Sequence, residues 1–155
     1  MSGIDPALVA EYGVEERWSL ALTRRAEWRD TDGFGHVNHL TYLEWCEDIR
    51  NRYMEVVGLP RLSAETPGPV LKSVSFDYAR ALGFGDEVLV TARVAAMRRT
   101  SFTMDYAVWQ AGLVGRGSAL CVLMINRTGE RVPIPEAMRA AIAARDGIAP
   151  MEPGG

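Results

Sequence analysis

The sequence predicts an α+β fold in which one long helix packs against an antiparallel sheet. Residues 39–57 repeat apolar side chains at a helical period, and four later segments have the composition and alternation of strands. The chain has 155 residues, of which 48% are hydrophobic and 24% charged, which suits one domain with a real core. We therefore expect a single domain over residues 1–155, with a core at about 18–145 and loosely held ends, 1–13 and 149–155.

The first predicted strand covers residues 18–28, where apolar and polar residues alternate. Gly33 and Gly35 then break the strand, and the long helix follows with Asn38 as its N-cap. Gly58 and Pro60 end that helix. The expected inward face of the strand is Trp18, Leu20, Leu22, Ala26 and Trp28, and the expected helical stripe is Tyr42, Trp45, Cys46, Ile49, Tyr53, Val56 and Val57.

Four more strands are predicted at residues 69–82, 86–97, 100–109 and 113–126. Their links are short, which favours antiparallel neighbours along the chain, because parallel strands need a long crossover. Residues 113–126 are the most continuously apolar, so we expect cover on both faces. In residues 86–97 the expected inward face is Val88, Val90, Ala92, Val94 and Ala96. Residues 134–147 predict a short closing helix.

The composition excludes several classes of function. A net charge of −3 without a long basic block argues against general nucleic-acid binding. Cys46 and Cys121 form no CxxC pair, which favours a reducing cytoplasm. The first 18 residues lack the features of a signal peptide, and no apolar run approaches the roughly 20 residues that span a membrane.

The polar residues between the first strand and the long helix are the best candidates for chemistry. If Asn38 caps the helix, the first free amides belong to His39, Leu40 and Thr41, at the positive end of the helix dipole. Such amides can hold a carbonyl oxygen that gains negative charge during acyl transfer. A nearby Asp32 carboxylate could attack the carbonyl or activate water, and Gly35 would allow close approach of a substrate.

The segment DTDGFGHVNHLTYLEWCEDIR, residues 30–50, resembles the signature of the 4-hydroxybenzoyl-CoA thioesterase family, which are acyl-CoA thioesterases of hotdog fold. The likeness extends over roughly residues 20–143. It implies a long central helix wrapped by a curved five-stranded antiparallel sheet, and hydrolysis of an acyl thioester of CoA or of acyl carrier protein. It also implies catalysis by Asp32, a polarising amide near His39, no metal or cofactor, and sites formed between paired subunits. The chain departs from the family at Glu27, where members often carry arginine.

Other residues of this region have a functional and a structural interpretation. His36 is expected to order the loop or contact substrate, and Asn38 to do the same or to cap the helix. Asp30 is expected to be a turn residue, or one that supports the site from behind, and not the catalytic carboxylate. Tyr42 lines an acyl pocket or is part of the core, and Glu47 with Arg50 forms a surface pair. Arg98 and Arg99 bind CoA phosphates or occupy a solvated turn.

Hydrolysis of an acyl-CoA by a homodimer or homotetramer is the leading hypothesis, and three alternatives remain open. A non-hydrolytic hotdog protein would bind or dehydrate acyl thioesters. A metal enzyme would use Asp30, Asp32, His36 and His39, which have suitable ligand types but lie within ten residues. A structural module would simply self-associate through sheet edges.

Overall fold

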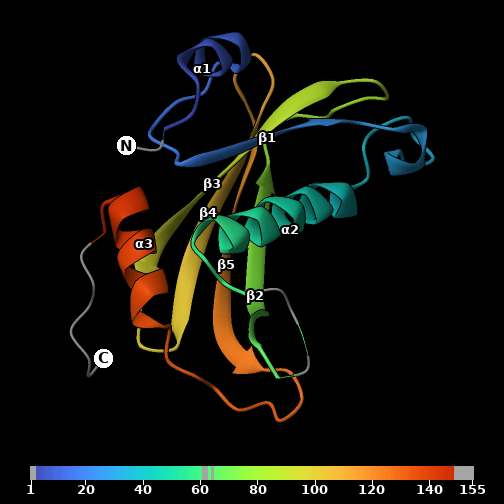
Figure 1. Ribbon diagram of the computed structural model, residues 1–155. Coiled ribbons are helices and arrows are strands. Elements are labelled where there is room, and N and C mark those ends of the chain that lie inside the picture. Colours follow the sequence, from blue (N-terminus) through green and yellow to red (C-terminus); the bar gives the residue numbers. More distant parts are fainter. Residues whose placement is uncertain (1–2, 61–62, 64, 149–155) are drawn as a thin grey trace.

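The computed structural model describes residues 3–60, 63 and 65–148, so the expectation for residues 149–155 lies outside the described residues. Its helices are α1 (Pro6–Tyr12), α2 (His39–Val56) and α3 (Glu136–Asp146), with a 3₁₀ turn, η1 (Trp28–Asp30). Its strands are β1 (Leu20–Arg25), β2 (Pro67–Tyr78), β3 (Glu87–Met97), β4 (Ser101–Trp109) and β5 (Leu113–Ile125). Every predicted strand and both predicted helices are present, and α1 is an additional element (Figure 1).

The five strands form one antiparallel sheet in the order β1-β3-β4-β5-β2. The predicted pairing of β3 with β4 and of β4 with β5 is confirmed. The prediction that β2 and β3 are neighbours is wrong, because β2 pairs with β5 at the opposite edge of the sheet. The link 79–86 therefore crosses between the two strands, and it is held by Leu82, which is buried in the main core.

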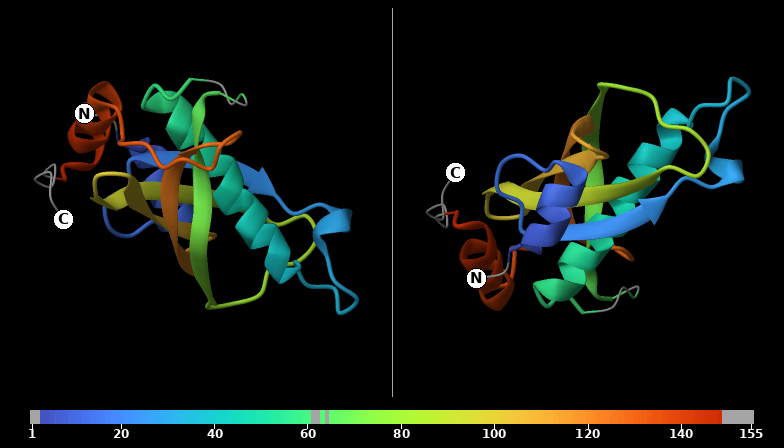
Figure 2. Two further views of the ribbon diagram at one scale, coloured as in Figure 1. Left: turned by 90° about the horizontal axis from the view of Figure 1, so that it is seen from below. Right: turned by 90° about the horizontal axis from the view of Figure 1, so that it is seen from above.

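Helix α2 lies diagonally across one face of the sheet, as both views in Figure 2 show. Its predicted stripe is buried except for Val56, which is 39% exposed in the last turn. The inward face predicted for the first strand holds only in part. Trp28 is exposed in η1, and Trp18 precedes β1 and packs with Trp109 in a second cluster.

Helix α1 covers the other face of the sheet, although residues 1–13 were expected to be loosely held. Tyr12 is buried there with Trp18, Leu89 and Trp109. The carbonyl of Tyr12 accepts the amide of Gly112 at 2.9 Å, which ties the helix to the β4–β5 turn. Gly13 ends α1 in the left-handed conformation at φ 66°, where a side chain would meet the backbone of Gly112.

Helix α3 closes the other end of the core, as predicted, and buries Met138 and Ile142. The carboxylate of Asp146, its last residue, accepts the Tyr53 hydroxyl of α2 and the Val94 amide of β3, the latter at 2.9 Å. One side chain therefore joins α3 to both α2 and the sheet.

The exposure of side chains differs from the prediction in two strands, β3 and β5. A register shift between Val94 and Ala96 places Ala96 in solvent and Met97 in the core, so the prediction for Ala96 is wrong. Strand β5 alternates over much of its length, with Leu120 partly exposed, so it is not fully covered on both faces as predicted. Strand β2 is the more open edge and contains no buried residue from position 69 onward.

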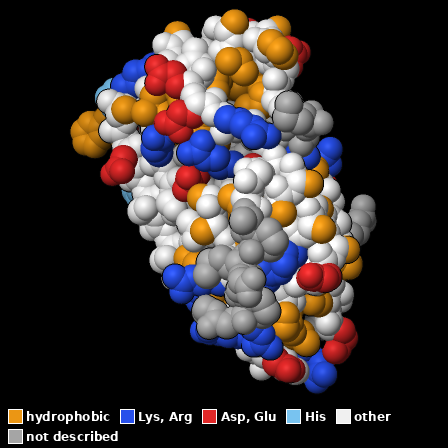
Figure 3. All heavy atoms as spheres, turned by 90° about the vertical axis from the view of Figure 1, so that its left-hand side faces the viewer, with side chains coloured by type: hydrophobic (Ala, Val, Ile, Leu, Met, Phe, Trp, Pro, Cys, Tyr) orange, Lys and Arg blue, Asp and Glu red, His pale blue; other side chains and the backbone are white. Residues whose placement is uncertain are grey.

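The outer surface shows no broad field of one charge on the face drawn in Figure 3, where acidic and basic side chains are interspersed. Among the described residues, no helix has the length and apolar character needed to cross a membrane.

Candidate active site

The segment between η1 and α2 folds into a tight loop that projects beyond the sheet (Figure 2). Thr31 and Val37 pair across its base, and the amide of Asp32 donates to the carbonyl of His36 at 2.7 Å. Gly35 has φ 82°, a conformation that favours glycine. Glycine is therefore needed at this position for the backbone conformation of the turn.

The loop is anchored to the crossing link 79–86. The amide of Val37 donates to the carbonyl of Leu82 at 2.8 Å, and His36 forms an antiparallel bridge with Gly83. The backbone of His36 thus helps to order the loop, through this bridge and through its amide, which donates to Asp32 Oδ1 at 3.1 Å. Because β2 and β3 are not neighbours, the link between them crosses from one strand to the other. That link supports the candidate site.

Two backbone amides of the loop hold the Asp32 carboxylate. Its Oδ1 accepts the amide of Phe34 at 2.7 Å and that of His36 at 3.1 Å. These two hydrogen bonds lower the pKa of Asp32 below its ordinary value, so the side chain is a carboxylate at neutral pH. Its Oδ2 has no hydrogen-bond partner in the part of the chain that the structure describes, and the residue is exposed in the single chain.

Asn38 caps α2 as predicted, with its Oδ1 accepting the amide of Leu40 at 2.9 Å. The amide of Thr41 donates to the carbonyl of Asn38 at 3.0 Å. The amide of His39, the first residue of the helix, has no acceptor among the described residues. One helix amide therefore remains available, at the position expected for a donor to a carbonyl oxygen.

A group of aromatic rings lies beneath the start of α2. Tyr42 packs at 5.5 Å from Phe76 and 5.1 Å from Tyr78, measured between ring centroids. The Tyr78 hydroxyl donates to the carbonyl of His39 at 3.1 Å, so β2 holds the first turn of the helix. Tyr42 is itself buried in the main core, which supports its structural interpretation, whereas Phe76 and Tyr78 are more open.

Arg50 is a buried residue that sequence reasoning placed at the surface. Its Nη1 donates to the hydroxyl of Tyr106 at 3.0 Å, and Glu47 lies 3.8 Å from its Nη2. The only sequence signal was its position four residues after Cys46, on the edge of the apolar stripe. The presence of Glu47 three residues earlier favoured a surface pair instead.

Arg98 and Arg99 are not brought to Asp32 within one chain. They follow the end of β3, whereas the link beside the Asp32 loop precedes its start. Eleven strand residues separate the two ends, which is roughly 35 Å. Arg139 donates instead to the carbonyls of both arginines, at 2.9 and 3.2 Å.

The metal interpretation receives no support from the geometry. Within residues 3–60, 63 and 65–148, no three His, Cys, Asp or Glu side chains gather as a metal site would require. Asp30 is a turn residue as predicted, because its Oδ2 accepts the amide of Glu27 at 2.8 Å.

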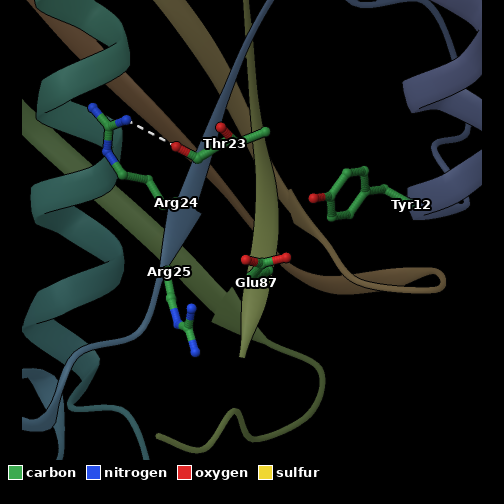
Figure 4. Close-up of a pocket in the computed structure, with 5 residues that line it drawn as sticks. All are labelled: Tyr12, Thr23, Arg24, Arg25 and Glu87. Carbon is green, nitrogen blue, oxygen red and sulfur yellow. Dashed lines mark hydrogen bonds between the residues drawn. The ribbon is translucent and has the colours of Figure 1, made fainter. Parts of the chain in front are cut away.

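Two surface cavities lie away from this loop. One, of about 310 Å³, opens between α1 and β1 and is drawn in Figure 4. Arg24 points away from it toward α2, where it pairs with Asp48 at 3.3 Å. The other, of about 240 Å³, is lined by Arg93, Arg116 and neighbouring polar residues of β2 and β5. No predicted site residue lines either cavity.

Comparisons with known proteins support the interpretation of this region. A family model described as the thioesterase-like superfamily matches residues 26–142, which include the Asp32 loop and all of α2. The crystal structure of a thioesterase superfamily protein from Jannaschia sp. CCS1 is 34% identical, covers 96% of both chains and has a TM-score of 0.85. The predicted hotdog fold is therefore confirmed.

Two further relatives are more distant. A thioesterase from Thermus thermophilus, crystallised with coenzyme A and Zn, is 27% identical over 85% of this chain and 97% of its own, with a TM-score of 0.73. A 1,4-dihydroxy-2-naphthoyl-CoA hydrolase from Rippkaea orientalis is 25% identical over 75% of this chain and 89% of its own.

Proposed function

The chain belongs to the thioesterase-like superfamily, and from this premise we propose that it hydrolyses an acyl-CoA thioester to a free acid and the CoA thiol. The observation that carries the proposal is the pair formed by an ionised Asp32 and the free amide of His39, on either side of one short loop. A charged oxygen and an unpaired helix amide are the two groups that a minimal acyl-transfer site needs.

The proposed mechanism uses the two groups in complementary roles. The amide of His39 donates to the thioester carbonyl oxygen and stabilises the negative charge that develops on it. The free oxygen of Asp32 either takes a proton from an attacking water or attacks the carbonyl itself. In both cases the C–S bond breaks, and the departing CoA thiolate takes up a proton. Hydrolysis of an acyl–Asp32 anhydride would complete the second route.

CoA is the carrier that the comparisons favour. Relatives of this chain are described as a thioesterase complexed with coenzyme A and as a naphthoyl-CoA hydrolase. Membership of the narrower 4-hydroxybenzoyl-CoA group is part of the same proposal, on the strength of the motif from Asp30 to Arg50.

We further propose that two copies of the chain pair to complete the site. In one chain Asp32 is exposed, and so are Leu71, Val74 and Tyr78 along the edge strand β2. An open strand edge with apolar side chains favours pairing with another copy. A second subunit over this edge would enclose the apolar surface beside α2 and reduce the access of water to Asp32.

The test follows release of free thiol from a panel of short, long, branched and aromatic acyl-CoA thioesters. Wild-type protein is expected to release thiol from at least one of them. Asp32→Asn removes the charge with little change in shape, so it should abolish most of that release while the circular dichroism spectrum stays unchanged. Wild-type rates in that variant would remove Asp32 from the mechanism, and tight binding without thiol release would favour a non-hydrolytic protein.

A further inference from the structure

Arg50 is a buried cation without a buried anion. Its side chain is 9% exposed, and Tyr106, the group that accepts its hydrogen bond, is neutral. Glu47 is the only carboxylate that pairs with it among the described residues, at 3.8 Å and with a largely exposed side chain. A guanidinium has five N–H donors, and burying its charge without a close anion is costly. The site therefore holds donors and charge that the chain itself does not use.

An uncovered apolar surface lies beside this cation. Arg50 donates a hydrogen bond to the hydroxyl of Tyr106 on β4. Tyr106 pairs with Gly117 of β5, which pairs in turn with Phe76 of the edge strand β2. Cys121 pairs across the sheet with Leu71, and Ala119 pairs with Val74. Residues opposite each other in an antiparallel pair project to the same face, so both β2 side chains point to the side of α2.

The two β2 side chains have no cover in the single chain. Leu71 is 43% exposed and Val74 is 40% exposed. Phe76 of the same strand contacts Tyr42 of α2, which independently places this face of β2 on the helix side of the sheet. The edge of the fold therefore offers an apolar floor near one buried positive charge, whose carboxylate partner Glu47 is largely exposed and lies 3.8 Å away.

This surface and the proposed reactive centre lie along the same side of α2. His39 and Arg50 are eleven residues apart on α2, which is three turns and about 16 Å, so they lie on the same side of the helix. Helical side chains tilt toward the N-terminus, which brings the guanidinium nearer to the start of the helix than its own Cα. An acyl group of suitable length, bound at the His39 amide and running along α2, would extend toward Arg50.

We infer that Arg50 is a specificity-determining residue that binds a carboxylate at the far end of the acyl group. The preferred substrates are then ω-carboxyacyl-CoA thioesters, the mono-CoA esters of dicarboxylic acids. A carboxylate matches the planar guanidinium and neutralises its charge, whereas an alkyl end does neither. The inference rests on the proposed acyl-CoA site, but it concerns recognition and not the chemical step.

The test measures equilibrium binding by calorimetry with thioether analogues of CoA esters, which cannot be hydrolysed. Each pair has equal chain length and differs only in the terminal group: hexanoyl against adipyl, octanoyl against suberyl, decanoyl against sebacyl. Wild-type protein should bind the carboxylated member of at least one pair about tenfold more tightly or better. Equal binding of the two members of every pair overturns the inference. An analogue with a terminal hydroxyl that binds as tightly as the carboxylated one also overturns it, because charge would then not be recognised.

Variants then assign the preference to one side chain. Arg50→Met keeps much of the volume without the charge, and the ratio of the two dissociation constants should fall to about one. Arg52→Met is the matched control, because Arg52 lies on the same helix, is exposed and pairs with Glu55. A preference that survives in Arg50→Met, or that disappears equally in Arg52→Met, overturns the assignment.

A second variant covers the case in which Arg50→Met does not fold. Glu47→Gln removes the one carboxylate that competes for the guanidinium, at an exposed position, so the preference for carboxylated analogues should increase. An unchanged or smaller preference would then overturn the inference. Thiol release from the true thioesters is recorded separately. Selective binding without release would reject the proposed hydrolysis and leave the role of Arg50 standing.

Discussion

The Oδ1 atom of Asn38 accepts the amide of Leu40 at 2.9 Å, and this bond determines which amide at the start of α2 is left for a ligand. The carbonyl of Asn38 takes the amide of Thr41 as well. One capping residue thus satisfies two of the first three amides and leaves that of His39. The cap and the proposed oxyanion donor are therefore parts of one arrangement.

His39→Pro tests this donor directly. Proline is well tolerated at the first position of a helix, and Asn38 already has φ −62° and ψ 140°, which suits a residue before proline. The variant should fold with unchanged helix content and lose about a hundredfold or more in kcat, because it lacks the N–H group. His39→Ala keeps the amide and is the control. If both variants lose kcat equally, the imidazole and not the amide is required. If neither loses kcat, His39 has no role in catalysis.

The pH dependence of kcat/KM should identify Asp32 as the acid-side group. Its two amide partners stabilise the charged form and lower its pKa below the ordinary value for aspartate, so the carboxylate stays ionised until the pH falls through that lowered pKa. Activity should therefore be independent of Asp32 protonation across the neutral range and fall only in strong acid. A loss of activity centred near neutral pH would point to a histidine instead.

Local patterns in the sequence predicted the elements well. The helical stripe placed α2 at residues 39–57 against an observed end at Val56, and the cap at Asn38 was correct. The pairing of β2 with β5 was not predictable from link length, because the two strands are about fifty residues apart in the sequence. The link that follows β2 also contributes Leu82 to the main core. Ala96 is exposed and not buried because of a single register shift in β3, which the alternation of apolar residues alone does not reveal.

The candidate site was predicted in its residues but not in its contacts. Asp32 was expected near the first amides of α2, but its hydrogen bonds were not predicted. Its Oδ1 binds the amides of its own loop, which only the folded turn around Gly35 brings into range. The burial of Arg50 depends on Tyr106, which is 56 residues away. In each case a tertiary contact, which no short stretch of sequence encodes, decides the environment of a charged group.

Gly117→Ala should destabilise the fold through the aromatic group beneath α2. A Cβ at this position would lie 2.6 Å from Cδ2 of Phe76 and 2.8 Å from the carbonyl oxygen of Ser75, so a ring and a backbone would both have to move. We expect a loss of about 1–3 kcal/mol in the free energy of unfolding, measured with urea. Gly33→Ala is the control, because no atom lies within 4 Å of its added Cβ, and an equal loss there would contradict the steric explanation.

Val74→Asp tests the proposed pairing of two chains through β2. Val74 is 40% exposed in the single chain and lies on the face that a second copy would cover, so a charge there would be buried in the pair. Val56→Asp is the matched control, since Val56 is 39% exposed but lies at the far end of α2. Sedimentation should show wild-type protein and Val56→Asp as dimers or tetramers, and Val74→Asp as a monomer with reduced thiol release. Because Asp32 is exposed in one chain, a monomeric wild-type protein with full activity would contradict the idea that a second subunit completes the site.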